Sequence, residues 1–362
     1  MTGGETTAID RSVLVTGGAG FIGSNFVHHM IERGYPIVTL DALTYAGNRA
    51  NLSKLKDNPQ HVFVEGSILD RKLVTSTLST YKPRAVVNFA AESHVDRSID
   101  GPSAFIETNI VGVYTLLEAF NSYFTSDAGR DAKFLHVSTD EVYGSLESGA
   151  ASESSVYAPT SPYAATKASA DHLVSAWQKT FGTPAMITNC SNNYGPYQFP
   201  EKLIPLMILK AVGEEALPIY GNGLQERDWL HVSDHCRALE LVLSRGRPGQ
   251  TYNVASGVQH RNIDVVTEIC AILDRLRPRQ NGSSYQDLIE HVQDRPAHDL
   301  RYAVDASKIV RELNWAPLVE FSAGILQTVT WYLANRAWTE GVSRKYPGQR
   351  LGNKSSGEEN HA

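Results

Sequence analysis

A glycine-rich turn near the start of the chain limits the folds that this sequence can adopt. The turn is Thr16-Gly17-Gly18-Ala19-Gly20-Phe21-Ile22-Gly23, and it lies between a short apolar run and an amphipathic stretch. Gly17 permits the tight turn, Gly20 lets the backbone approach a pyrophosphate, and Gly23 lets the following helix lie close to the strand. The helix N-terminus then offers N–H groups and the positive end of its dipole to phosphates. The pattern predicts a strand–turn–helix unit that binds a dinucleotide.

Short apolar runs alternate with helical patterns through the first half of the chain. The predicted strands are Ser12–Thr16, Pro36–Asp41, His61–Glu65, Ala85–Ala90 and Lys133–Ser138. The predicted helices are Phe21–Arg33, Arg71–Thr80, Phe105–Phe124 and Tyr163–Phe181. Because this alternation is typical of parallel sheets covered by helices, we expect an α/β fold with a doubly wound, Rossmann-like parallel sheet.

A carboxylate, Asp41, ends the second predicted strand. At that position a carboxylate accepts hydrogen bonds from the adenosine ribose hydroxyls and repels a 2′-phosphate, so NAD is favoured over NADP. The structural alternative is a simple turn in which Asp41 acts as a cap. The strand before the glycines and the helix after them favour the cofactor interpretation.

The chain of 362 residues is long enough for two domains. We expect an NAD-binding Rossmann domain over residues 1–190, with the chain crossing back to it at about 228–255. A smaller mixed α/β domain for the substrate is expected over 191–340, because Pro- and Gly-punctuated segments follow Cys190. The polar, Gly/Ser-rich end, residues 341–362, is expected to be a flexible tail.

Composition excludes several classes of partner. Lys and Arg total 33 against 39 Asp and Glu, a net charge of -6, so neither nucleic acid nor an anionic membrane is attracted. The first ten residues lack the pattern of a signal peptide, and no apolar run reaches the roughly 18 residues of a membrane span. The three cysteines are widely spaced, which predicts no disulfide framework and no metal site. We therefore expect a cytoplasmic enzyme that acts on a small molecule.

Two features of the sequence point to acid–base chemistry. Tyr163 and Lys167 are one helical turn apart, so both lie on one helix face. A nearby ammonium, together with the positive ring of oxidised NAD, would lower the tyrosine pKa and yield a phenolate base. Thr139, Asp140 and Glu141 follow the fifth strand, whose carboxyl end faces the ligand crevice. Adjacent carboxyl groups, one protonated and one ionised, supply the general acid and base that removal of water requires.

The sequence resembles the extended short-chain dehydrogenase/reductase (NAD-dependent epimerase/dehydratase) family and, within it, the dTDP-glucose 4,6-dehydratases. The likeness extends over about residues 12–336. Its most specific stretches are Asp41–Asn48, Phe89–Ser98, Ser138–Gly144, Thr188–Pro205, Arg227–Trp229 and Asp294–His298.

The resemblance implies a lyase that uses NAD catalytically on a nucleotide sugar. Tyr163 would take the C4 hydroxyl proton as hydride passes to NAD, with Thr139 hydrogen-bonded near that hydroxyl and Lys167 beside the phenol. Glu141 would remove the C5 proton and Asp140 would protonate the departing C6 hydroxyl. Hydride then returns to C6, giving dTDP-4-keto-6-deoxyglucose.

The resemblance also assigns binding positions. Expected cofactor contacts, with those of the glycine turn, are Gly17, Gly20, Phe21, Ile22, Gly23, Asp41, Thr44, Ser67, Ile68, Phe89, Ala90, Ala91, Thr108, Tyr163, Lys167 and Asn192. Expected substrate contacts are Ser93, Thr139, Asn193, Lys202, Leu203, Arg227, Asn262, Asp294, His298 and Tyr302. Lys202 and Arg227 carry the cations that a bound diphosphate needs.

Two departures from the family pattern leave affinity open. Ser67 stands where the family usually has an Asp that contacts adenine, and Ala297 replaces a usual Gly. A homodimer formed through the helices at 105–124 and 163–181 is implied by the resemblance alone.

Three alternative functions are weighed against this one. A nucleotide-sugar 4-epimerase shares the scaffold but typically has small residues in place of Asp140 and Glu141. A 4,6-dehydratase of another nucleotide sugar, such as UDP-glucose, differs only in base recognition. A catalytically silent NAD-binding regulator requires none of the five acid–base residues, and their joint presence argues against it.

Overall fold

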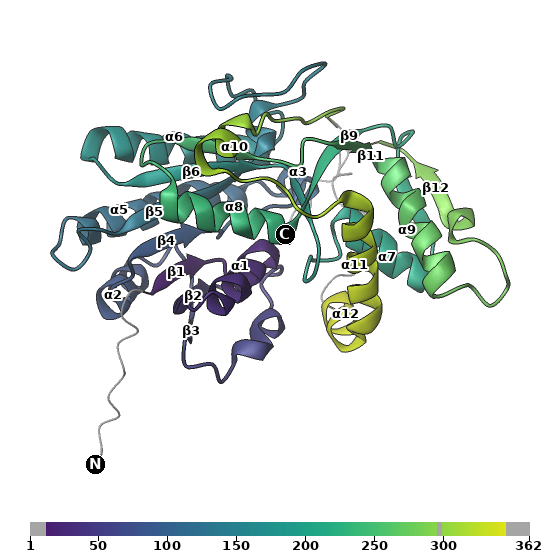
Figure 1. Cartoon of the computed structure of the whole chain (residues 1–362), viewed down its shortest axis with the longest axis horizontal. Coiled ribbons are helices and arrows are strands. Elements are labelled where there is room, and N and C mark those ends of the chain that lie inside the picture. Colours follow the sequence, from purple (N-terminus) through teal and green to yellow (C-terminus); the bar gives the residue numbers. More distant parts are fainter. Residues whose placement is uncertain (1–11, 295–298, 345–362) are drawn as a thin grey trace, which may run out of the picture.

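Seven parallel strands form the main sheet of the computed structural model, which describes residues 12–294 and 299–344 (Figure 1). The strand order is β10-β6-β5-β4-β1-β2-β3, and every neighbouring pair is parallel. The strands are β1 (Val13–Thr16), β2 (Ile37–Asp41), β3 (His61–Glu65), β4 (Ala85–Asn88), β5 (Lys133–Thr139), β6 (Ala185–Cys190) and β10 (Thr251–Val254). The predicted doubly wound α/β fold is confirmed.

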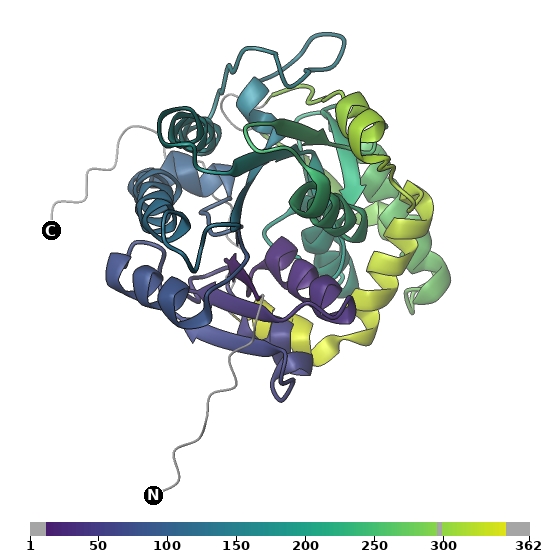
Figure 2. The ribbon, with the colours of Figure 1, turned by 60° about the vertical axis from the view of Figure 1, so that its left-hand side comes forward.

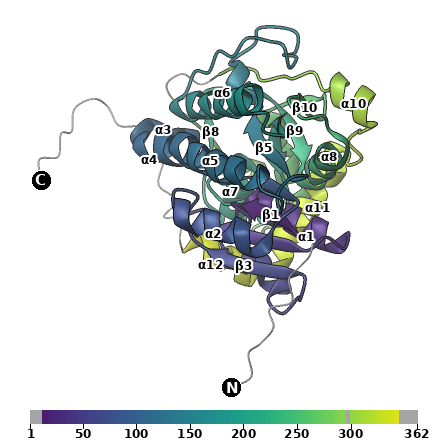
Figure 3. The same ribbon diagram turned by 90° about the vertical axis from the view of Figure 1, so that its left-hand side faces the viewer.

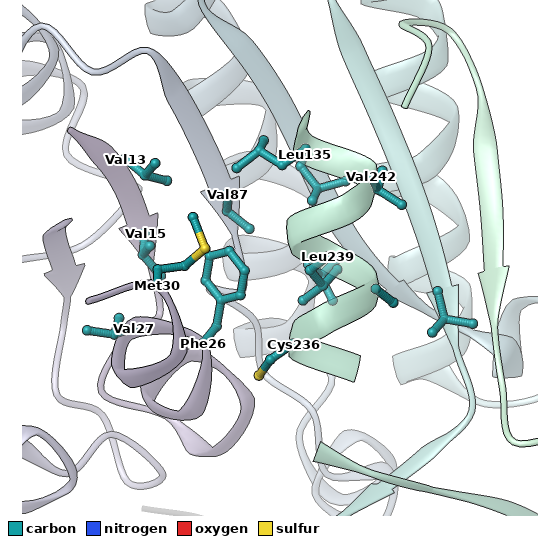
Figure 4. Packing of buried hydrophobic residues seen from close by; sticks show 14 of the residues in the cluster. Val13, Val15, Phe26, Val27, Met30, Val87, Leu135, Cys236, Leu239 and Val242 are labelled. Atoms are coloured by element: carbon teal, nitrogen blue, oxygen red, sulfur yellow. The ribbon is translucent and has the colours of Figure 1, made fainter. Parts of the chain in front are cut away.

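Helices cover both faces of this sheet (Figures 2 and 3). One face carries α1 (Phe21–Glu32), α8 (Val232–Arg245) and α10 (Ser307–Leu313), and the other carries α2 (Arg71–Tyr81), α5 (Val113–Phe124) and α6 (Pro162–Phe181). Because both faces are covered, the strands are nearly continuous apolar runs. On the first face, Phe26 and Met30 of α1 and Leu239 of α8 pack with Val15 and Val87 of the sheet (Figure 4).

Local sequence explains the bounds of α6, the helix that carries the candidate base. The Ser161 hydroxyl accepts a hydrogen bond from the Ala164 N–H at 3.1 Å, and Pro162 occupies the first turn. At the other end Gly182 adopts φ +70°, the left-handed conformation that glycine allows at low cost. The helix therefore begins immediately before Tyr163.

The helix predicted over Phe105–Phe124 differs from the observed one. It comprises α4 (Ser103–Ile106), a π-helical segment η2 (Glu107–Gly112) and α5. Within η2, the Asn109 amide bonds both backbone groups of Glu92, at 2.9 and 3.0 Å, and the Thr166 hydroxyl at 2.9 Å. These contacts come from distant segments, so the hydrophobic pattern of the helix did not indicate them.

A smaller lobe flanks the carboxyl ends of the sheet strands (Figure 1). Its strands are β7 (Asn192–Tyr194), β8 (Leu217–Tyr220), β9 (Glu226–His231), β11 (Gln259–Arg261) and β12 (Ile289–Val292). They form a three-stranded sheet, β11-β9-β7, and a parallel pair, β12-β8. Its helices are α7 (Leu203–Val212), α9 (Asn262–Leu276), α11 (Phe321–Ala334) and α12 (Arg336–Ser343), and the first three share one apolar core.

The remaining short elements connect these parts. They are η1 (Arg49–Leu55), α3 (Val95–Asp100), η3 (Asp140–Tyr143) and η4 (Tyr285–Leu288). Helix α12 runs into the segment predicted as a tail, whose residues 345–362 lie outside the described part of the chain. Among the described residues, no helix has the length and apolar character needed to cross a membrane.

Candidate active site

One cavity of about 580 Å³ lies between the large sheet and the smaller lobe. It runs past the carboxyl ends of the parallel strands, where ligands of open α/β sheets bind. The predicted cofactor residues on its wall are Gly17, Gly20, Phe21, Ile22, Gly23, Asp41, Thr44, Ser67, Ile68, Phe89, Ala90, Ala91, Thr108, Tyr163, Lys167 and Asn192. The predicted substrate and acid–base residues on it are Ser93, Thr139, Asp140, Glu141, Asn193, Lys202, Leu203, Arg227, Asn262 and Tyr302.

The two remaining predicted substrate residues are Asp294 and His298. Asp294 is described but is not among the lining residues, and its carboxylate accepts a hydrogen bond from Gln225 Nε2 at 2.9 Å. His298, with Ala297, lies in residues 295–298, outside the described part of the chain.

The glycine turn is shaped for a dinucleotide. Gly17 has φ +70°, and a Cβ there would lie 2.6 Å from the Ala90 nitrogen. A Cβ on Gly23 would collide with the Gly17 carbonyl, so this glycine allows helix and turn to touch. The N-cap of α1 is Gly20, which has no side chain with which to cap the helix, and the first residues of α1 line the cavity. These features fit a pyrophosphate at the helix end.

Asp41 braces the same turn from the end of β2. Its carboxylate accepts the N–H of Ala19 and the N–H of Leu43, each at 2.8 Å. Burial raises the pKa of Asp41, while these two bonds oppose the shift. A carboxylate has about four acceptor positions, so Asp41 retains capacity for ribose hydroxyls. The residues present therefore fit NAD.

The acidic pair lies where β5 ends and η3 begins. Thr139 is the N-cap of η3, and its hydroxyl accepts the Glu141 N–H at 3.3 Å. Asp140 is buried, and this burial, followed by the charges of Glu141 and Asp228, raises its pKa well above the usual range. The Asp140 carboxyl is therefore suited to stay protonated and to donate a proton.

Tyr163 and Lys167 are both buried on α6. Burial, and next the charge of Glu141, raises the pKa of Tyr163 well above its usual value. The opposite shift is predicted from the sequence for the NAD-bound state, in which the positive ring of the cofactor adds to the charge of Lys167. Lys167 Nζ donates to the Val137 carbonyl at 2.8 Å and lies 3.3 Å from His136 Nε2. Burial lowers the Lys167 pKa, and the charge of Asp171 opposes the shift.

A buried polar pair behind Lys167 was missed by the sequence analysis. Asp171 accepts hydrogen bonds from the Ser138 hydroxyl at 2.9 Å and the Tyr157 hydroxyl at 3.0 Å. Its other oxygen lies 3.6 Å from His136 Nε2. Burial raises the Asp171 pKa to about 7, and Lys167 opposes the shift. The available signal was an acid four residues after Lys167, on the same helix face.

The two lobes are tied together across one end of the cavity. Arg97 of α3 pairs with Glu201 of the smaller lobe at 2.9 Å, and its guanidinium lies 4.0 Å from the centre of the Tyr45 ring. Next to it, Lys202 Nζ donates to the Ser93 carbonyl at 2.8 Å. Lys202, predicted to hold a diphosphate, is thus positioned by the opposite lobe.

The other predicted diphosphate cation, Arg227, is buried in β9. Its guanidinium donates to the carbonyls of Glu226 and Asp299, each at 2.8 Å, and lies 4.5 Å from the centre of the Tyr302 ring. These contacts fix the guanidinium plane on the cavity wall. A fixed guanidinium grips phosphate oxygens with little further loss of entropy.

Comparison with known proteins gives concordant matches. Residues 14–328 match the family model of GDP-mannose 4,6-dehydratase. The chain is 57% identical over 344 residues to the dTDP-glucose 4,6-dehydratase of Xanthomonas campestris pv. campestris strain B100, covering 94% of this chain and 98% of that protein. It is 52% identical to dTDP-glucose 4,6-dehydratase 1 of Escherichia coli K12, covering 91% and 95%.

Solved structures agree. DesIV, a dTDP-glucose 4,6-dehydratase of Streptomyces venezuelae with NAD and TYD bound, matches with a TM-score of 0.84 and 45% identity, covering 91% of this chain and 99% of that one. The UDP-glucose 4-epimerase of Thermotoga maritima matches with a TM-score of 0.80 but 27% identity, covering 90% and 99%. The backbone is thus common to both activities, whereas sequence identity favours the dehydratases.

Proposed function

We propose that this chain, which belongs to the GDP-mannose 4,6-dehydratase family and within it to the dTDP-glucose 4,6-dehydratases, removes water from dTDP-glucose to give dTDP-4-keto-6-deoxyglucose. The observation that carries the proposal is the gathering of Thr139, Asp140 and Glu141 with Tyr163 and Lys167 on one cavity wall. An oxidoreductase that acts only on an alcohol does not need the two carboxyl groups. An enzyme that also eliminates water needs both.

The cofactor in this proposal is NAD, held by the glycine turn, the N-terminus of α1 and Asp41. When bound, NAD supplies the acceptor for the C4 hydride and the donor of the same hydride to C6. The Lys167 ammonium, one helical turn from Tyr163, favours the phenolate. Its charge therefore opposes the rise in the Tyr163 pKa that burial causes. Tyr163 then takes the C4 hydroxyl proton.

The carboxyl pair performs the elimination. A ketone at C4 acidifies the C5 proton, so oxidation comes first. Glu141, half-buried on the wall, removes that proton. Asp140, whose pKa is raised well above the usual range, protonates the C6 hydroxyl as it leaves as water. The different environments of Glu141 and Asp140 indicate that Glu141 is the base and Asp140 the acid.

The first prediction concerns the substrate. Purified protein with NAD and dTDP-glucose is expected to form the 4-keto-6-deoxy product, measured by its absorbance in alkali. UDP-glucose lacks the thymine methyl group and carries an added 2′-hydroxyl, and it should turn over at least roughly tenfold less efficiently, because one methyl-sized group in a fitted pocket is worth about that much. GDP-glucose serves as a third comparison. Formation of dTDP-galactose would instead identify a 4-epimerase, and no turnover of any nucleotide sugar would favour a silent NAD-binding protein.

We further propose that two copies of the chain associate through the helices at 103–124 and 162–181, in the cytoplasm. Exposed apolar side chains mark these helices: Ile106 is 48% exposed, Val111 45%, Tyr114 43% and Phe181 51%. The two helices lie side by side on one face of the large sheet (Figure 3). A second copy of the same face would cover this apolar surface.

The second prediction tests this association. The unmodified protein is expected to have twice the chain mass of 39.7 kDa by light scattering coupled to size exclusion. Val111→Glu is expected to give the single-chain mass, because it places a charge in the apolar contact. Leu318→Glu, at a leucine that is 71% exposed outside these helices, is the matched control and should remain dimeric. A single-chain mass for the unmodified protein at micromolar concentration would refute the proposed dimer.

A further inference from the structure

The side-chain amide of Asn193, on the cavity wall, is held from two sides. Asn193 Nδ2 donates to the Ser191 carbonyl at 2.9 Å, and Asn193 Oδ1 lies 2.9 Å from Nδ1 of His235. A backbone carbonyl only accepts hydrogen bonds, so the amide atom that faces Ser191 is the nitrogen. The atom that faces His235 is then the oxygen. Together these two contacts define which way round the amide lies.

Both partners of the amide are fixed by their own surroundings. The Ser191 N–H donates to the Val254 carbonyl at 3.0 Å, and the Ser191 hydroxyl donates to Asp228 at 2.8 Å. His235 belongs to α8, which packs on the large sheet, and its side chain is 0% exposed. Asn193 itself lies on β7 of the smaller lobe. A helix of the large sheet therefore supports a residue of the smaller lobe at the cavity.

The position of the proton on the His235 ring follows from the same contacts. An amide oxygen only accepts hydrogen bonds, so Nδ1 of the ring carries the hydrogen and donates it to Asn193. Burial lowers the pKa of His235 to about 3, so the ring is neutral and Nε2 carries no hydrogen. Nε2 is buried and has no hydrogen-bond partner among the described residues. The polar function of this ring is therefore the single bond to Asn193.

The orientation of the amide determines what Asn193 offers to a ligand. Its nitrogen carries two hydrogens, and Ser191 accepts one of them, so one N–H remains. A nucleotide sugar presents diphosphate and hydroxyl oxygens, which accept such a bond. Without the donor on His235, Asn193 Oδ1 would be buried and unpaired, and the amide would turn away to relieve that cost. The remaining N–H would then lose its direction.

We propose that His235 is a positioning residue, which fixes the Asn193 amide so that its remaining N–H binds the nucleotide sugar. Among the described residues, those that line the cavity do not include His235, so it acts through Asn193 and does not touch the substrate. This role rests on the proposed function, which names the substrate, and adds a residue that sets its affinity. Loss of such a residue weakens substrate binding without changing the chemical steps, which raises KM and leaves kcat unchanged.

Three substitutions of His235 test this role at one position. His235→Leu fills the space without a donor, and His235→Gln carries its N–H farther out, toward the position of Nε2. His235→Asn keeps an N–H at the position of Nδ1 and is the matched control. With the NAD-loaded enzyme, the leucine and glutamine variants are expected to raise KM for dTDP-glucose about tenfold, with kcat within about twofold. The asparagine variant should keep KM within about threefold of the unmodified value.

The other outcomes overturn the inference. An unchanged KM in His235→Leu would show that the bond to Asn193 does not contribute to binding. A rise in KM that His235→Asn shares, or a fall in kcat at constant KM, would show that the ring acts only through packing. Thermal unfolding of each variant without substrate verifies folding, and His235→Gln makes the same comparison if the leucine variant does not fold.

Failure of the proposed function has a separate signature. If the unmodified protein forms no product from dTDP-glucose, the dehydration is contradicted, whereas the role of His235 is still measured by calorimetric titration of the same variants with dTDP-glucose. The same order of affinities is expected there, with the unmodified protein and His235→Asn binding about tenfold more tightly than His235→Leu. Equal affinities in that titration would refute the positioning role.

Discussion

Replacing Tyr163 with phenylalanine is expected to slow C4 oxidation by about 100- to 10,000-fold, the usual contribution of a positioned general base. The variant keeps the ring, which packs against Phe105, and loses only the oxygen that receives the proton. The measurement is the single-turnover appearance of NADH absorbance after mixing the NAD-loaded enzyme with dTDP-glucose. Tyr143→Phe is the matched control, because Tyr143 is also buried but does not line the cavity.

The pH dependence of the same step has a defined sign. Oxidation uses the phenolate, and burial together with Glu141 raises the Tyr163 pKa, so the rate should rise as pH increases toward that pKa. Glu141→Gln removes a neighbouring negative charge, which lowers the Tyr163 pKa and moves the rising limb to lower pH. An oxidation rate for Tyr163→Phe within a few-fold of that of Tyr143→Phe would contradict the assignment of Tyr163 as the base.

Replacing either carboxyl group, Asp140 or Glu141, should leave C4 oxidation intact and slow the later elimination of water. Asp140→Asn and Glu141→Gln are each expected to slow overall turnover by about 100- to 10,000-fold, while C4 oxidation continues. NADH absorbance should therefore build up and persist, because the hydride cannot return to C6 before water has left. Product absorbance in alkali and NADH absorbance, followed on the same samples, separate the two steps.

The control for these variants is Glu147→Gln, at an exposed position shortly after η3. It should change neither signal. If Asp140→Asn and Glu141→Gln both turned over near the unmodified rate, the acid and base roles would have to be assigned elsewhere. If NADH failed to appear in either variant, that residue would be acting in oxidation rather than in elimination.

The large sheet was predictable because its strands carry a strong local signal. Strands buried on both faces are continuous apolar runs, and the predicted Ser12–Thr16 and Pro36–Asp41 agree with β1 and β2 to within a residue. The smaller lobe lacked such a signal. Strands β8 and β12 pair across a long stretch of sequence, and neither alternates clearly enough to indicate its partner. The π-helical turn at Asn109 likewise depends on contacts with distant segments.

Many residues of the cavity wall could be predicted from sequence motifs, whereas the contacts that support them could not. The glycine turn, Asp41 and Tyr163 carry recognisable spacing, so chemistry alone suggested their roles. His136 lies inside an apolar strand, and Arg97 and Glu201 are far apart in sequence. Such residues become visible only when the fold brings their partners to them. Burial and the charge of Glu141 raise the Tyr163 pKa in the chain without cofactor, and the spacing of Tyr163 and Lys167 does not report either effect.

The path of the chain between the lobes has a consequence for how the enzyme can be divided. After β9 the chain forms α8, which packs on the large sheet, and β10, which is one of its strands. The chain then returns to the smaller lobe. A fragment ending at Cys190 would lack a helix that covers one sheet face and would leave β6 as an open edge that invites aggregation. The complementary fragment would carry α8 and β10 with nothing to pack against. Neither half is self-sufficient, so the smaller lobe cannot be swapped between relatives by joining two intact gene segments.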